Sequence, residues 1–204
     1  MDARNYNPLM LEEAGAKSAH SQDGEGESHP PPLRVVAPAR RQPVDLPIPA
    51  TTGEMRARIA AFDWSKTPFG PREAWPPSLS LTVKTALASR YPMILLWGPD
   101  FLQIYNDAYA QLIGDKHPSA LGISITITLA EAWDTLGPIC GKVLRTGEAS
   151  WMPALLLLLN RAGYREETYF SVSHGVVEDE EGHNAGVLGV CSEVTQQVVG
   201  ERRL

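Results

Sequence analysis

The sequence has few cysteines and no long apolar run. Its 204 residues contain two cysteines, Cys140 and Cys191. These are too few for a disulfide scaffold, so we expect both to be reduced and buried. The longest apolar run, residues 154–159, is much shorter than the roughly 20 residues that span a bilayer. Residues 1–10 lack the apolar stretch of a signal peptide. We therefore predict a cytoplasmic protein that neither crosses nor enters a membrane.

Positive charge is also scarce. The chain carries 18 Lys and Arg against 24 Asp and Glu, which gives a formal net charge of −6. A surface that binds nucleic acid normally needs a basic patch, so we expect no nucleic-acid partner. With 43% hydrophobic residues, the chain has enough apolar material for one globular domain of ordinary size and a tail.

Residues 1–52 lack the material of a hydrophobic core. They contain no Trp or Phe, a single Tyr, and eight of the 17 prolines. Such a segment cannot bury enough apolar area to offset the entropy lost on ordering it. We predict a disordered, Pro-rich leader, to which the sequence assigns no role.

Composition and hydrophobic pattern change in residues 53–92, which we predict to be a helical extension. Apolar residues of 54–62 share one stripe of a short helix. In 79–87 apolar residues recur at spacings of three and four, and Ser78 is the predicted N-cap of that helix. Between the helices, the turn-rich segment 63–77 carries two tryptophans, which we expect to clamp it against the domain.

The next segment predicts a β-hairpin followed by a helix. The apolar runs 93–97 and 101–105 are separated by the Gly-Pro-Asp triplet at 98–100, which favours a turn. Asn106 and Asp107 then precede apolar residues at helical spacing. Side chains of this kind accept hydrogen bonds from the free amides of a first helical turn, so both are predicted caps.

The middle of the chain gives two contrasting patterns. Residues 123–128 alternate between apolar and polar side chains, which locally predicts a strand. Residues 136–144 place apolar side chains at i, i+3, i+4, i+7 and i+8, and Gly147 follows. This pattern predicts the clearest helix of the protein, ending at the glycine.

Three further strands are predicted before the C-terminus. Residues 151–159 form a fully apolar run typical of a central strand, and strands over 165–177 and 185–191 follow. The acidic segment 178–184 between the last two is predicted to be an exposed hairpin loop. Residues 195–204 become polar and helical in pattern. Two strands, helices and three strands predict an α+β fold, with an antiparallel sheet covered by helices on one face.

From about residue 53 onwards, the chain resembles the PAS sensor regions at the N-termini of bacterial sensor histidine kinases, which often precede GAF domains. Six collinear segments carry the resemblance: DWSKTPFGPREAWPPSL, SRYPMILLWGP, YNDAYAQLIGDKHPSALG, TLGPICGKVLRTGEA, GYREETYF and ERRL. The resemblance implies a PAS core at 93–194 with a five-stranded sheet and a small-molecule pocket. It also implies a homodimer, kinase or GAF modules as partners, and output through a helix that starts in 195–204.

A pocket of this kind needs inward side chains from the long helix and from the strand over 165–177. We expect Ile139 and Val143 to point inward, with Trp133 at the mouth. Which face of the strand points inward is left open by its pattern, and we take the face of His174 as inward. The predicted ligand-binding residues are Tyr105, Trp133, Ile139, Val143, Phe170, Val172 and His174. Alternatively, these residues simply fill the core.

The cofactors known to bind related folds lack their usual ligands here. A flavin photoadduct needs a reactive cysteine on the helix after the hairpin, and none is present. Haem needs a histidine on or just before the long helix, and residues 130–148 contain none. His117 falls in a loop and His174 on a strand, while His183 and Cys191 show no zinc spacing with it. The sequence thus disfavours flavin photochemistry, haem and a metal site, and it identifies no cofactor.

Three functional hypotheses follow. The favoured one is a cytoplasmic PAS sensor domain in signal transduction, which dimerises and binds a small apolar ligand. The chain shows neither a phosphoacceptor H-box nor an ATP-binding region, so it is not expected to be an enzyme. The second hypothesis is a small α+β cone-fold enzyme of isomerase or hydrolase type, with Tyr105, Asp107 and His174 as acid–base candidates, although no G-x-S-x-G motif is present. The third is a protein-interaction module with a filled core.

Overall fold

The computed structural model describes residues 53–201. The description below concerns these residues alone. The prediction for the leader, residues 1–52, lies outside the described residues, as do the last three residues of the predicted C-terminal helix. None of the helices within residues 53–201 has the length and apolar character needed to cross a bilayer.

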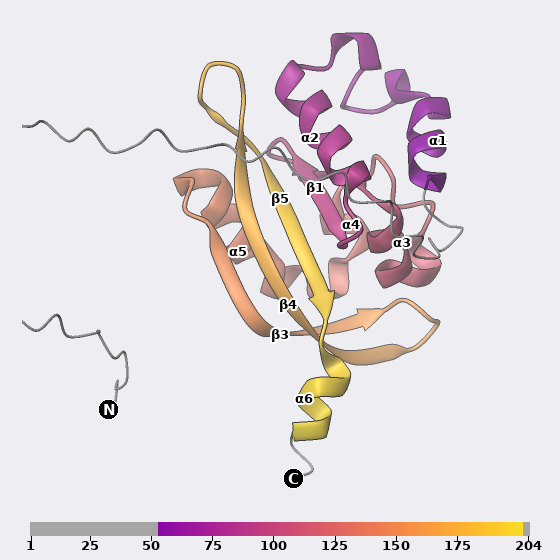
Figure 1. Ribbon diagram of the computed structural model, residues 1–204, viewed down its shortest axis with the longest axis vertical. Helices are drawn as coiled ribbons and strands as arrows, with labels where there is room; N and C mark the ends of the chain where they lie inside the picture. The colour runs from indigo at the N-terminus through magenta and orange to yellow at the C-terminus, as the bar shows by residue number, and fades with distance from the viewer. Residues whose placement is uncertain (1–52, 202–204) are drawn as a thin grey trace, which may run out of the picture. The chain divides into compact units, whose positions relative to one another are not determined.

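One five-stranded sheet organises the domain (Figure 1). Its strands are β1 (Met93–Trp97), β2 (Leu102–Tyr105), β3 (Ser150–Asn160), β4 (Arg165–Glu178) and β5 (Asn184–Glu193). The strand order is β2-β1-β5-β4-β3, and every neighbouring pair is antiparallel. The predicted α+β fold with a five-stranded antiparallel sheet is therefore confirmed.

The hairpin predicted from local signals forms as expected. Strands β1 and β2 pair from Ile94 opposite Tyr105 to Trp97 opposite Leu102. Phe101, which closes the turn, has a φ of 51° and donates its backbone N–H to a carbonyl at the start of the turn. A short turn between two apolar runs thus sets the register of this end of the sheet.

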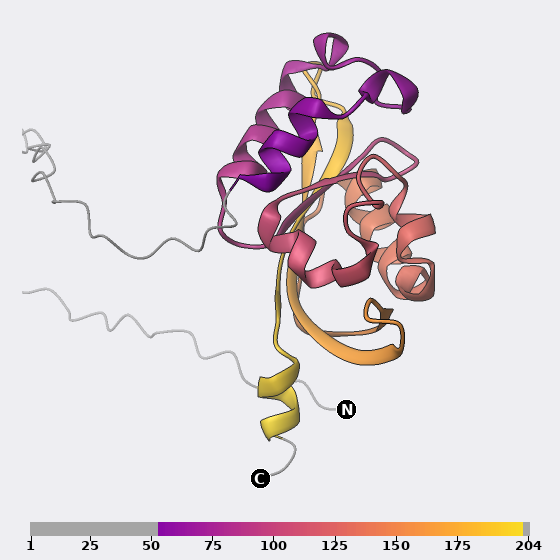
Figure 2. The ribbon, with the colours of Figure 1, turned by 90° about the vertical axis from the view of Figure 1, so that its right-hand side faces the viewer.

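Three helices cover one face of the sheet: α3 (Asp107–Ile113), α4 (Ile125–Thr128) and α5 (Trp133–Thr146). The apolar stripe of α5 buries Leu136, Cys140 and Val143, so the predicted long helix is confirmed. It ends at Gly147, whose left-handed φ of 74° lets its N–H bond the carbonyl of Val143 at 2.9 Å. Figure 2 shows α5 on one side of the strands, opposite α1 and α2.

The strand predicted over residues 123–128 is wrong, because this segment contains α4. Its hydroxyl-bearing N-cap, Ser124, accepts a hydrogen bond from the N–H of Thr126 at 3.3 Å. Ile125 and Leu129 are four residues apart and are both buried, whereas Ile127 is 70% exposed. A strand would have buried Ile125 and Ile127 on the same face, so burial here follows the helical period.

Two longer helices lie in the N-terminal extension, α1 (Glu54–Ala61) and α2 (Pro77–Ala88), as predicted. α2 contacts β1 and β2. Paired residues Leu95 and Ile104 are 0% and 1% exposed, and their side chains point to the opposite face from Ile94 and Leu96 of the same hairpin. The extension therefore packs on the other side of the sheet from α3–α5 (Figure 2).

The segment between α1 and α2 is held by its two tryptophans, as predicted. The rings of Trp64 and Trp75 pack edge to face, with their centroids 4.9 Å apart. The indole N–H of Trp64 donates to the carbonyl of Ile59 at 2.8 Å, and that of Trp75 donates to the carbonyl of Gly70 at 3.1 Å. Each indole therefore packs its apolar body in the cluster and keeps its one donor satisfied.

Two predicted caps act elsewhere. α2 begins at Pro77, so Ser78 lies inside its first turn, where its N–H donates to the Glu180 carboxylate at 2.6 Å. The carboxylate comes from the loop between β4 and β5, which local sequence patterns could not reveal. Likewise, the Asp107 carboxylate accepts the backbone N–H of Met55 at 2.9 Å and so caps α1 rather than α3.

The apolar strand predicted to be central, residues 151–159, is instead the edge strand β3. Its inward side chains, including Leu157 and Leu159, are buried, whereas Trp151 and Leu156 on the outward face are 69% and 42% exposed. A strand that is apolar on both faces normally indicates burial on both faces. Here the outward face is left uncovered.

The remaining short elements connect these layers. They are the 3₁₀ turns η1 (Trp64–Lys66), η2 (Arg72–Ala74), η3 (Gly114–Lys116) and η4 (Ala130–Ala132), and the terminal helix α6 (Thr195–Glu201). α6 follows directly from β5 and contacts β4. Both cysteines are buried and unpaired, as predicted.

Candidate functional site

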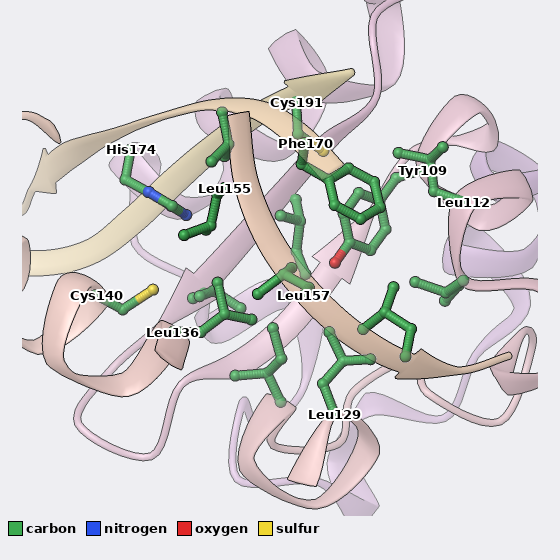
Figure 3. Close-up of a pocket in the computed structure, with 16 residues that line it drawn as sticks. Tyr109, Leu112, Leu129, Leu136, Cys140, Leu155, Leu157, Phe170, His174 and Cys191 are labelled. Atoms are coloured by element: carbon green, nitrogen blue, oxygen red, sulfur yellow. The ribbon is translucent and has the colours of Figure 1, made fainter. Parts of the chain in front are cut away.

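A cavity of about 60 Å³ lies between the sheet and helices α3, α4 and α5. Most of the side chains that line it are aliphatic, and they come from all three helices and from strands β1, β3, β4 and β5 (Figure 3). β3 contributes alternate leucines, Leu155, Leu157 and Leu159, because side chains two apart share one face of a strand. The centre of the core is thus apolar but incompletely filled.

Two buried polar side chains enter this apolar lining, Tyr109 from α3 and His174 from β4. They are 7% and 5% exposed. Among the described residues, the Tyr109 hydroxyl has no hydrogen-bond partner, and in Figure 3 it points inward among the lining side chains. The Nδ1 of His174 lies 3.2 Å from Ser150 Oγ, which leaves Nε2 unpartnered within residues 53–201. Buried polar atoms are normally hydrogen-bonded, so both groups are available to a molecule in the cavity.

Local structure explains how each polar side chain is placed. The side chain of Asn106 accepts the backbone N–H of Tyr109 at 3.0 Å, so the predicted N-cap is confirmed and it fixes the first turn of α3. His174 lies opposite Gly189 of β5. A Cβ at Gly189 would come within 3.1 Å of Ile94 and 3.5 Å of the His174 ring. The glycine therefore leaves the imidazole room to lie against the sheet.

The titratable groups around the cavity are neutral near pH 7. Burial lowers the pKa of His174 to about 4 and raises the pKa of Tyr109 well above its usual 10. Burial also raises the pKa of Cys140 and that of Cys191 to about 12. A charged ligand would find no opposite charge on these lining groups, and burying an unpaired ion is costly.

These shifts also bear on the enzyme hypothesis. A general acid or base works best when its pKa lies near the operating pH, but the pKa of His174 and that of Tyr109 move away from neutrality. The two thiols are protonated and so are poor nucleophiles. The arrangement therefore suits binding of a neutral molecule better than acid–base or nucleophilic chemistry.

Three of the predicted ligand-binding residues line the cavity. Phe170, Val172 and His174 all lie along it, because β4 presents this face to the helices. The three are 5%, 7% and 5% exposed. The sequence pattern did not decide which face of this strand points inward. In the structure, the face with these three residues borders the cavity.

The other four predicted residues are not among those that line the cavity. Tyr105 is fully buried, and its hydroxyl lies 3.1 Å from His117 Nδ1. Trp133 packs on the Phe101 ring at a centroid distance of 5.2 Å. Val143 is 0% exposed in the packed core, and Ile139 is only half-buried on α5.

Sequence reasoning missed most of the cavity wall. The missed lining residues are Ile94, Leu96, Tyr109, Leu112, Ile113, Ile125, Leu129, Leu136, Cys140, Leu155, Leu157, Leu159 and Cys191. A usable signal existed for Tyr109, which stands three residues after its cap and carries a hydroxyl on an otherwise apolar helical stripe. The leucines of β3 could not be sorted by face, because apolar residues occupy both faces of that strand.

Arg161, in the loop between β3 and β4, links the cavity wall to the end of the sheet. Its Nη1 donates to the carbonyl of Leu112 on α3 at 2.9 Å and lies 2.8 Å from a carboxylate oxygen of Glu193 on β5. The second oxygen of Glu193 accepts the hydroxyl of Thr195, the first residue of α6, at 2.9 Å. Since Leu112 lines the cavity, a continuous hydrogen-bonded path runs from the cavity wall to α6.

A second path runs along β4. Phe170 lines the cavity, and its neighbour Tyr169 bonds the start of α6 with both backbone groups. The N–H of Tyr169 donates to Thr195 Oγ1 at 3.0 Å, and its carbonyl accepts the N–H of Val194 at 2.7 Å. The first turn of α6 is therefore tied to a strand that forms part of the cavity wall.

Asp179, Glu181 and His183 place possible metal-ligand atoms within 4.8 Å of one another in the β4–β5 loop. One oxygen of Asp179 already accepts the backbone N–H groups of Glu181 and His183 at 3.0 and 2.8 Å. An aspartate that closes a turn in this way is a common feature of hairpin loops. The turn alone accounts for the cluster.

No protein-family model and no curated protein sequence matches the chain. Among solved structures it is similar to an RNA-binding light-oxygen-voltage receptor, at 16% identity and a TM-score of 0.48. That alignment covers 67% of this chain and 39% of the receptor chain. It is also similar to the PAS domain of BvgS from Bordetella pertussis, at 17% identity and a TM-score of 0.41 over 61% of this chain and 92% of that chain.

A sensory box sensor histidine kinase from Vibrio cholerae is similar at 16% identity and a TM-score of 0.41. That match covers 58% of this chain and 93% of the kinase chain. PAS and light-oxygen-voltage domains are thus among the structures similar to this chain. Identities this low do not transfer a function, so the function has to rest on the chain's own residues.

Proposed function

We propose that this chain is a sensory signalling domain of the PAS type, in which a small molecule in the cavity alters the start of α6. The observation that carries the proposal is the apolar cavity of about 60 Å³ that lies between the sheet and α3–α5. A packed core without a binding role would be filled to ordinary interior density. The cavity, with its two unpartnered polar groups, therefore favours a binding domain over an interaction module with a filled core.

The coupling to α6 is supported by the two hydrogen-bonded paths. A molecule that pushes α3 outward would move the carbonyl of Leu112 and with it the Arg161 side chain. Arg161 holds Glu193, and Glu193 accepts from Thr195 at the start of α6. A ligand shifts a conformational equilibrium only by its differential affinity for the two states. Here that difference is the fit of α3 against an occupied or an empty cavity.

Xenon tests the proposal because it enters small apolar cavities without needing a polar contact. We expect xenon pressure to shift the backbone amide NMR signals of cavity-lining residues and those of Thr195–Glu201. In an Arg161→Gln variant, the α6 response is expected to fall by about half or more, while the cavity response persists. Arg165→Gln, an exposed arginine on the neighbouring strand, is the matched control. Cavity shifts without any α6 response in the unmodified protein would refute the coupling.

The proposal includes a homodimer formed through the outward face of β3 and β4. Trp151 and Leu156 are 69% and 42% exposed on that face, and their neighbours on β4 include uncharged Ser171 and Ser173. This uncharged patch can pair with its own copy across a two-fold axis, and Arg165 and Glu167 on the same face of β4 lie further along the strand. Sedimentation velocity should give a dimer that Trp151→Ser shifts to monomer, whereas Tyr91→Ser, at a 66% exposed site elsewhere, leaves it intact. A monomeric unmodified chain at high micromolar concentration contradicts this part.

On the resemblance of its six sequence segments, we further propose that the domain acts in the cytoplasm on kinase or GAF modules. A fusion in which residue 204 continues into a histidine kinase catalytic region tests this directly. Xenon is expected to change the autophosphorylation rate of the fusion, and Arg161→Gln should remove most of that change. A rate that ignores xenon while the cavity binds it would argue against the kinase partner.

A further inference from the structure

The cavity has a polarity pattern that restricts what it can hold. Its two polar side chains, Tyr109 and His174, are more than nine-tenths buried, and each keeps one atom without a partner among the described residues. The other lining groups are aliphatic side chains, the Phe170 ring and two thiols. A purely apolar occupant would leave the hydroxyl and the imidazole unsatisfied, which has a free-energy cost.

The size of the cavity limits the occupant further. About 60 Å³ of free space is roughly four-tenths of the cavity of about 150 Å³ that holds a benzene molecule. The space therefore suits a molecule of about two or three non-hydrogen atoms.

The hydrogen-bonding capacity of the site is mixed. The Tyr109 hydroxyl can donate one bond and accept others, and a neutral imidazole has one donor and one acceptor nitrogen. Ser150 bonds Nδ1 of His174. Nε2 is therefore an acceptor when Nδ1 carries the proton, and a donor when it does not. Such a pair satisfies a hydroxyl or carbonyl oxygen, whereas an ion would lack a counter-charge.

We propose that the cavity binds a neutral molecule of about two or three non-hydrogen atoms, with one hydroxyl or carbonyl group held by Tyr109 and His174 and an apolar remainder against the leucines. This inference rests on the proposed sensory function, since it specifies the ligand class for the same cavity. It assigns Tyr109 the role of the specificity-determining contact.

Three isosteric probes test the proposal: propane, ethanol and ethylammonium, which differ only in an end group that is methyl, hydroxyl or ammonium. So few atoms limit affinity to dissociation constants on the order of a millimolar or weaker, so binding is followed by NMR titration of the full chain. We expect ethanol to shift the cavity-lining amides, and ethylammonium to bind at least about tenfold more weakly.

The variants isolate the tyrosine hydroxyl. In Tyr109→Phe, the ethanol dissociation constant should rise about five- to tenfold, as expected for one lost hydrogen bond, while that of propane is unchanged. Tyr105→Phe is the matched control, because Tyr105 is also buried but its hydroxyl bonds His117 outside the cavity. It should leave both probes unaffected.

Each other outcome overturns the proposal in a distinguishable way. Ethylammonium that binds as tightly as ethanol would exclude the requirement for a neutral ligand. Equal loss of propane and ethanol in Tyr109→Phe would reduce the tyrosine to a packing role. If ethanol does not bind up to about 100 millimolar, the proposed ligand class is wrong, because this range detects even about a third of the greatest binding energy that three non-hydrogen atoms can supply. The xenon experiment still decides the sensory function independently in that case.

Discussion

The two layers that cover the β1–β2 end of the sheet differ in how completely they are packed. In the layer of α1 and α2, Met55, Ile59, Trp64 and Leu79 are 0–2% exposed. The Trp64 ring packs edge to face on that of Trp75. The layer of α3–α5 is also buried, yet it encloses a cavity of about 60 Å³. Strand β1 thus borders a hollow through Ile94 and Leu96 on one face. On its other face Leu95 is fully buried, and no strand residue borders the hollow that lies between α1, α2 and their connecting segment.

This difference in packing suggests a different role for each layer. Close-packed interiors transmit strain and resist local change, so the α1–α2 layer is expected to hold the strands in place. Helix α3 borders the cavity, and it is the helix whose carbonyl at Leu112 accepts a hydrogen bond from the Arg161 side chain. A ligand can therefore move the hollow side while the filled side keeps the sheet fixed. The following predictions test this division.

The largest effect is expected from removing an aromatic side chain on the filled side. Trp64→Ala should lower the free energy of unfolding by about 3–5 kcal/mol, because it leaves a cavity in a well-packed cluster. Trp151→Ala, at a site that is 69% exposed, should change it by less than about 1 kcal/mol in the monomer. Urea denaturation at low protein concentration measures both. If the two substitutions lower the free energy of unfolding equally, the α1–α2 layer is not packed more tightly than the exposed face of β3.

The second prediction concerns the hollow side and follows from the buried imidazole. His174 has a pKa of about 4 in the folded chain against 6.5 for the ordinary side chain. Between these values the unfolded chain binds a proton that the folded chain does not. Stability is therefore full above pH 6.5 and falls as the pH drops towards 4, by about 3 kcal/mol in total.

The measurement is the change in unfolding free energy between pH 7.5 and pH 4.5, each protein compared with its own value at pH 7.5. His174→Gln should flatten this change by about 2 kcal/mol or more. His183→Gln, at an exposed histidine whose ion pair with Asp179 is screened by solvent, should alter it much less. A His174→Gln variant as acid-sensitive as the unmodified chain would show that the imidazole is charged in the fold, and with it that the cavity tolerates charge.

Local signals predicted much of this architecture. The Gly-Pro-Asp turn, the Asn106 cap and the stripe of α5 each depend on residues within a few positions of one another, and each formed as predicted. The failures share a different cause. Ser78 and Asp107 were assigned by neighbourhood, but a carboxylate 102 residues away from Ser78 and an amide 52 residues away from Asp107 decide their roles.

The cavity wall could not be assembled from periodicity for the same reason. β3 is apolar on both faces, so its pattern could not distinguish a central strand from an edge strand with one exposed face. The alternating residues of α4 indicated a strand because Ser124 and Thr126 stand between isoleucines, yet Ile125 and Leu129 pack at a helical spacing of four. Which side chains border the hollow depends on strand order and helix placement, and both are tertiary properties.

The smallest expected effect gives the sharpest comparison, because it makes the same kind of change on each side of the sheet. Cys140 on α5 lines the cavity and is 1% exposed, whereas Ala86 on α2 is 2% exposed. Replacing Ala86 with valine adds two methyl groups and costs roughly 0.5 kcal/mol in helix propensity, whereas replacing Cys140 exchanges a thiol for two methyl groups at almost no cost in propensity. The xenon titration separates the effect of free space from this difference in propensity.

Ala86→Val should lower the free energy of unfolding by about 1–3 kcal/mol, since overpacking strains a filled core. Cys140→Val should change it by less than about 1 kcal/mol, because the added methyl groups enter the cavity. The xenon titration provides the second measurement: Cys140→Val should weaken xenon binding, and Ala86→Val should not. If Cys140→Val is as destabilising as Ala86→Val and xenon binds both alike, the hollow side is packed as tightly as the filled side. The cavity could then not be the place where a ligand acts on α3.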